Sequence, residues 1–228
     1  MNEYKPRFPK PKITPAFKKR ILKDWQTCFP NLVRDGSLSL GRRVGPLLIS
    51  IGFDLKSGRE NYYPGFGVHN LSNPLDFLTS TLSTDLEGSP SYITVRYHEG
   101  GGYIEAAERM KQQSPLPLEG PVTLNMIIDA YEKYVDKRGP CVIDLLQDPA
   151  LIAAWAGQKE KAEEALAWGV KEFIKGGPQF QRDAGGLDGW FKEMQERISN
   201  PRKLRAIAEE QAIFHKVDHV PMEELIID

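Results

Sequence analysis

Residues 47–69 read LLISIGFDLKSGRENYYPGFGVH, and an alternation of side chains runs through the first nine of them. The odd positions are all apolar, namely Leu47, Ile49, Ile51, Phe53 and Leu55. Small or polar residues fill even positions, namely Ser50, Gly52, Asp54 and Lys56. A side-chain period of two is that of a β-strand with one buried face. The segment therefore predicts a half-buried strand.

The second half of the same stretch predicts a partner strand. Residues 56–60 contain a glycine typical of a turn, and the next run places Tyr62, Phe66 and Val68 on one face. A loop of about five residues puts Phe53 opposite Tyr62, Ile49 opposite Phe66 and Leu47 opposite Val68. This register joins both apolar sets on one face of a hairpin.

A third strand is predicted over residues 91–99, with Ile93, Val95 and Tyr97 on one side and Thr94, Arg96 and His98 on the other. Its neighbour in the sheet is not determined by the sequence. Residues 71–86 are ambiguous, because Asn73-Pro74 is able to start a short helix while the Ser and Thr content disfavours one.

Helical spacing of apolar residues dominates the rest of the chain. Helices are predicted over residues 15–28, 103–112, 123–139, 159–175 and 187–199, from 201 onward, and from Asp148-Pro149. The fold class is thus α+β: a small antiparallel sheet, a hairpin plus at least one further strand, in the N-terminal half, packed with a largely helical C-terminal half.

The chain divides into a flexible basic Pro/Lys-rich arm (1–14), a sheet-containing part (15–120) and a helical part (121–228) packed on the sheet as one domain. We expect the basic arm to keep the protein soluble rather than to contact a phosphate or an acidic partner. The net charge of -1 makes nucleic acid an unlikely partner. No apolar leader or run of about 18 apolar residues occurs, which predicts a soluble cytoplasmic protein without membrane contact.

The second face of the predicted sheet is the most informative feature. Serine and glycine positions leave it almost without side-chain height, and glycines inside strands indicate bulges or close approach by another chain. Pro64 lacks a backbone N–H, which predicts that its strand is an edge or is bulged. The predicted binding residues are Ser50, Gly52, Tyr63, Gly65, Gly67, His69 and Arg96. The alternative is an ordinary solvent-facing side, covered by a loop or by the C-terminal helices.

Catalytic and metal signatures are weak. The best acid–base candidates are His69 and His98 with Asp54 or Glu99. His215 and His219 have the i, i+4 spacing of metal ligands, but the sequence lacks HExxH, and two ordinary histidines near a helix end are favoured over a metal site. No cofactor is expected.

These patterns lead to two hypotheses. The first is a non-enzymatic module that binds another protein through the shallow polar sheet face or an edge strand, as in neutralising a toxin or acting as an accessory factor. The second is a small hydrolase-like enzyme that uses the histidine and carboxylate candidates, with or without a metal.

Overall fold

The computed structural model describes residues 11–55 and 60–228, and it has the predicted α+β architecture. Residues 1–10 of the predicted arm and the predicted hairpin tip at 56–59 lie outside the described residues. Ile13, at the end of the predicted arm, is 3% exposed and belongs to the main core.

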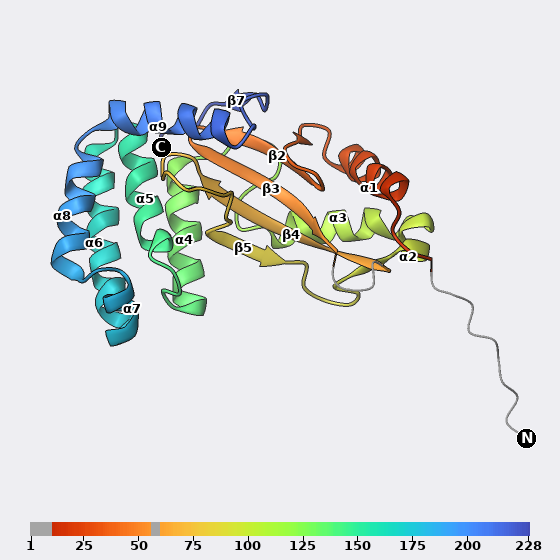
Figure 1. Cartoon of the computed structure of the whole chain (residues 1–228), viewed down its shortest axis with the longest axis horizontal. Helices are drawn as coiled ribbons and strands as arrows, with labels where there is room; N and C mark the ends of the chain where they lie inside the picture. The colour runs from red at the N-terminus through yellow and green to blue at the C-terminus, as the bar shows by residue number, and fades with distance from the viewer. Residues whose placement is uncertain (1–10, 56–59) are drawn as a thin grey trace, which may run out of the picture.

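A mostly antiparallel sheet forms the centre of the described structure (Figure 1). Its strands run in the order β1-β2-β3-β4-β5, with β6 pairing with β4, and β7 pairing in parallel with β2. The strands are β1 Val33–Arg34, β2 Ser39–Val44, β3 Leu47–Asp54, β4 Asn61–Asn70, β5 Leu82–Asp85, β6 Ile93–Thr94 and β7 Met222–Glu223.

The β3–β4 hairpin forms with a register two residues away from the predicted one. Ile51 pairs with Phe66 and Ile49 with Val68, whereas we expected Ile49 opposite Phe66. The ladder with β3 starts only at Tyr63, because β3 ends at Asp54, and Tyr62 pairs with β6 on the other side. A shift of two residues keeps every side chain on its face, so the assignment of faces survives the error.

The predicted third strand is wrong over most of its length. Only Ile93–Thr94 is a strand, and α2 (Val95–Glu99) follows directly. The Thr94 hydroxyl accepts a hydrogen bond from the Tyr97 N–H at 3.1 Å, which is an N-cap. The strand thus ends at Thr94, which caps the helix that follows. The candidate site residues Arg96, His98 and Glu99 therefore lie on α2 and not in the sheet.

The prediction that β4 is an edge strand is also wrong, because β3 lies on one side and β5 and β6 on the other. Pro64 is tolerated in this strand because its pairing with β3 does not require a backbone N–H from it. Its partner Phe53 donates its N–H away from β4, to Leu38 O, so this pair exchanges no ladder bond. The Pro64 carbonyl instead accepts from Leu86 N at 3.0 Å, between the segments paired with β5 and β6.

The helices of the described residues follow the predicted spacing with three exceptions, the first being α2, which replaces part of the predicted third strand. They are α1 Pro15–Cys28, α2 Val95–Glu99, α3 Gly102–Gln113, α4 Leu124–Arg138, α5 Asp144–Trp155, α6 Lys159–Lys175, α7 Gly177–Asp183, α8 Leu187–Ile198 and α9 Pro201–Phe214. Helix α5 begins four residues before the predicted Asp148 and continues through Pro149. Every residue from Leu145 to Ala154 is buried, so packing outweighs the proline penalty. Helix α7 was not predicted.

The two faces of the sheet are covered unequally. One face packs into the main core, which includes Trp25 of α1, Tyr62 of β4 and Ile127 of α4. On the other face a smaller cluster joins Leu48 of β3 to Ala208 and Ala212 of α9. In Figure 1, α9 reaches the sheet only at the end where α4–α8 gather, and α1 and α2 lie at the other end. No helix within 11–55 and 60–228 is long and apolar enough to cross a membrane.

Candidate functional site

A shallow cavity of about 480 Å³ lies on this less covered face, and we name it the sheet cavity. Two cross-strand rows run beneath it: Ser39, Gly52, Gly65 and Asp85 all line it, and of the adjacent row Gly41, Ser50, Gly67 and Ser83 the two central residues do. Of the predicted binding residues, the sheet brings six to this cavity: Ser50, Gly52, Tyr63, Gly65, Gly67 and His69. The predicted catalytic candidate Asp54 lines it as well.

The glycines of the floor differ in how much room they leave. A side chain at Gly52 would meet nothing within 4 Å, and one at Gly65 would touch Asp85 Oδ1 at 3.3 Å. A side chain at Gly67 would clash with Ser80, whose hydroxyl occupies the space above it. Gly41, which we did not predict, is covered in the same way by Asp35 and Ser50. The open floor therefore consists of Gly52 and Gly65.

Several residues of this site were not predicted from the sequence, and Asp35 is the most buried carboxylate among them. It is 9% exposed and lines the cavity, and Ser50 Oγ donates a hydrogen bond to its Oδ2. Its Oδ1 is buried and has no hydrogen-bond partner within the described chain. Burial raises the pKa of the Asp35 carboxyl. The Oδ1 atom is closed off from solvent, so a guest in the cavity does not reach it unless Asp35 moves.

The described lining of the cavity is acidic. Asp54 and Asp85 line it beside Asp35, and none of the described lining residues is lysine or arginine. A concave surface with charges of one sign attracts ligands of the opposite sign. The sequence analysis identified this face as polar, and the tertiary structure adds the sign of its charge.

His69 lines the same cavity and is 4% exposed. Its Nδ1 lies 2.8 Å from the Thr79 carbonyl oxygen, and its Nε2 has no partner in the described part of the chain. Burial lowers the pKa of the His69 imidazole, so the ring is neutral at pH 7. Its hydrogen bonds go to the Thr79 backbone and not to Asp54 or Glu99, the carboxylates proposed as its catalytic partners.

His98, Glu99 and Arg96 lie outside the sheet cavity, because α2 carries them to the end of the sheet. Arg96 lines a separate cavity with Tyr92 and Pro11, and Glu99 pairs with Arg20 at 3.7 Å. The Tyr92 ring contacts the ring of Tyr63, with 5.8 Å between centroids. Arg96 is thus beside the predicted binding face rather than on it.

His98 is fully buried in a chain of hydrogen bonds. Trp25 Nε1 donates to the Tyr62 hydroxyl at 2.9 Å, and that hydroxyl lies 2.7 Å from His98 Nδ1. The Asp24 carboxylate only accepts, so the His98 proton lies on Nε2, 3.0 Å from Asp24 Oδ2. Burial lowers the pKa of His98, so the ring is neutral and its Nδ1 accepts from the Tyr62 hydroxyl. Both ring nitrogens of His98 are paired and no solvent reaches the ring. These hydrogen bonds form a structural network that joins α1 and α2 to the sheet.

The helical geometry behind the metal hypothesis is absent. Helix α9 ends at Phe214, and Lys216 has a φ of 60°, so His215 and His219 do not share a helical face. His215 Nε2 lies 3.0 Å from Leu75 O, and His219 Nε2 lies 2.8 Å from Arg34 O. Both nitrogens carry protons in these bonds and present no lone pair to a metal. No group of three or more potential ligands occurs in residues 11–55 and 60–228.

A second polar cluster, which the sequence did not reveal, joins the sheet to the helices. The fully buried Asp148 of α5 accepts hydrogen bonds from Asn70 at 2.9 Å, Thr81 at 2.7 Å and Tyr131 at 2.9 Å. Burial raises the pKa of Asp148 to about 7. None of these four side chains lines any of the four cavities at 154–201, 11–96, 35–85 and 178–186, and their hydrogen bonds fix the position of α5.

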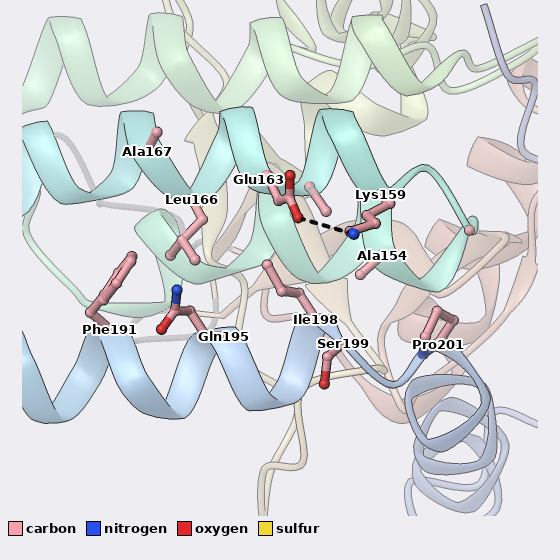
Figure 2. Close-up of a pocket in the computed structure, with 12 residues that line it drawn as sticks. Ala154, Lys159, Glu163, Leu166, Ala167, Phe191, Gln195, Ile198, Ser199 and Pro201 are labelled. Atoms are coloured by element: carbon pink, nitrogen blue, oxygen red, sulfur yellow. Dashed lines mark ion pairs between the residues drawn. The ribbon is translucent and has the colours of Figure 1, made fainter.

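Another cavity, of about 520 Å³, opens between α6 and α8 (Figure 2). Leu166 on α6 and Phe191 and Ile198 on α8 give it apolar walls. Lys159 and Glu163 pair with each other at 3.8 Å across part of it. None of the described buried polar side-chain atoms that lack a partner belongs to a residue of its lining.

Comparison with known proteins leaves the function to be argued from this geometry, since no family model, no curated protein and no solved structure matches the chain.

Proposed function

We propose that this chain is a non-enzymatic protein-binding module that docks a partner on the sheet cavity. The observation that carries the proposal is a backbone-level floor at Gly52 and Gly65 in a cavity whose described lining is acidic. An open glycine floor lets another chain approach the sheet closely, and the acidic lining favours a partner that brings basic groups. Neutralising a toxin, as an immunity protein does, and acting as an accessory factor are both functions of this kind.

Gly52→Trp is the sharpest test of this surface. A Cβ added at Gly52 meets nothing within 4 Å, so the new side chain starts in open space above the floor, whereas a Cβ at Gly67 would clash with Ser80. Gly189→Trp is the matched control, since Gly189 is an exposed glycine of α8 whose added side chain also meets nothing within 4 Å.

The experiment compares three immobilised proteins in a lysate of the native cell, after thermal melts have shown that all three unfold cooperatively. We expect a partner that is retained by the wild type and by Gly189→Trp and is lost by Gly52→Trp. Capture that is identical for all three proteins would rule out docking on the sheet cavity.

An enzyme remains the second candidate because of one observation, the neutral His69 with a partnerless Nε2 beside the cavity. Such a nitrogen is able to accept a proton. Binding ranks first because His69 is hydrogen-bonded to the Thr79 backbone and not to a carboxylate or a nucleophile within the described residues. Turnover of a generic ester that is abolished in His69→Gln would reverse this ranking.

A further inference from the structure

An apolar rim borders the sheet cavity on one side, and we define it as Phe77, Leu78 and Phe214. These side chains are 68%, 42% and 58% exposed, values that are unusual for large apolar residues. Leu78 lines the cavity itself. Exposed apolar side chains that gather beside a polar pocket mark interaction sites more often than solitary ones do.

Contacts between rings connect the far side of this rim to the cavity. The ring of Phe214 contacts that of His215, with 4.9 Å between centroids, and His215 contacts His69, with 5.4 Å between centroids. His69 lines the cavity. The loop that carries Phe77 and Leu78 is fastened to the same end of α9, because His215 Nε2 lies 3.0 Å from Leu75 O. Leu78 therefore lies in the cavity, and the ring contacts place Phe214 at the end of α9 that packs against its wall.

We infer that the occupant of this surface is a basic segment of a partner protein, with an arginine in the sheet cavity and a large apolar side chain on the apolar rim. This inference rests on the proposed function and adds the chemistry of the partner. Asp54 and Asp85 give the cavity negative charge, and none of its described lining residues is lysine or arginine. An arginine has five donors in a planar fork and satisfies several carboxylate oxygens at once.

Short synthetic peptides test this chemistry directly. Three fluorescein-labelled peptides share a Gly–Ser background and carry two arginines with two leucines, two glutamates with two leucines, or two arginines with two serines. Fluorescence anisotropy measures their binding to the full chain at low and high salt. We expect the arginine–leucine peptide to bind most tightly and to lose affinity as salt rises, because partly exposed charges are screened.

Paired variants separate the two halves of the surface. Asp54→Asn with Asp85→Asn should weaken the arginine–leucine peptide about tenfold, whereas Asp129→Asn with Asp188→Asn, on exposed positions of α4 and α8, should leave it unchanged. Leu78→Ser with Phe214→Ser should remove the advantage of that peptide over the arginine–serine peptide. Asp35 is left intact, because its bond to Ser50 makes it part of the fold.

The outcomes distinguish this inference from the proposal beneath it. Equal or tighter binding of the glutamate–leucine peptide, lost in Gly52→Trp, would overturn the basic segment while keeping docking on the cavity. Peptide binding that is unchanged in Gly52→Trp would overturn both the basic segment and docking on the sheet cavity. Self-association that Gly52→Trp abolishes would identify a second copy as the occupant and would likewise overturn the inference.

Discussion

His69 and His98 are both almost wholly buried histidines, and they belong to opposite faces of the same sheet. Burial lowers the pKa of each ring. His98 uses both of its nitrogens, toward Tyr62 and Asp24, on the face that packs against α1. His69 uses one nitrogen, toward Thr79, and leaves the other without a partner beside a cavity. The comparison teaches that burial alone does not distinguish a structural histidine from a candidate functional one, whereas the pairing of its atoms does.

Replacement of His98 tests the closed face and should have the largest effect. His98→Leu leaves the buried Tyr62 hydroxyl without its acceptor and Asp24 without its donor, so we expect a loss of about 2–4 kcal/mol in the free energy of unfolding. His69→Leu should lose only about 1 kcal/mol, since it removes contacts to one backbone group. Urea denaturation measures both, and equal losses would show that the pairing of atoms is not what separates the two sites.

Substitution of the floor glycines sharpens the description of the open face. Gly67→Val should destabilise the protein by about 1–3 kcal/mol through its clash with Ser80, while Gly52→Val should stay within about 0.5 kcal/mol of the wild type. The double variant Gly67→Val with Ser80→Gly should recover much of the loss. Failure of this rescue in thermal or urea unfolding would mean that Ser80 does not occupy the space above Gly67.

The contribution of His69 to the pH dependence of stability should be the smallest effect. The folded pKa of His69 lies below the ordinary value of about 6.5, so the folded state favours the neutral ring and stability falls as pH is lowered through about 6.5. Asp148 acts in the opposite sense, because its raised pKa of about 7 makes stability fall as pH rises from about 4 to 7.

The difference between wild type and His69→Asn isolates the histidine, since Asp148 is common to both proteins. We expect the variant to lose less stability than the wild type when the pH falls from about 7 to 5, by less than about 1 kcal/mol. Urea unfolding at several pH values measures this difference. A variant that responds to pH just as the wild type does would show that His69 does not titrate differently in the folded state.

Local patterns predicted much of the fold because local forces set it. Thr14 caps α1 through its side chain, and the helix predicted over residues 15–28 has the same bounds in the structure. The alternation in β3 predicted which side chains face the core, and that part survived a register error of two residues. The prediction failed where two local signals conflict: Thr94 belongs both to an alternating run and to an N-cap.

Parts of the candidate site were beyond such patterns. The glycines and His69 predicted a shallow polar face of the sheet. Nothing near Asp35 in the sequence predicts its contact with Ser50, fifteen residues away. Asp148-Pro149 looked like a helix start, and its position inside α5 follows only from burial on all sides. The apolar rim depends on α9 and the 71–81 loop meeting at His215 and Leu75, which are 140 residues apart.

The sequence by itself determined the class of the fold, the two faces of the β3–β4 hairpin and the positions of most helices, because side-chain period and capping act within a few residues. Only the tertiary structure decided which face stayed open, which of the two histidines was fully paired, and that Asp35, Asp54 and Asp85 gather at one cavity. Those outcomes depend on contacts between distant segments, whose free energies are set by packing and burial rather than by local conformation.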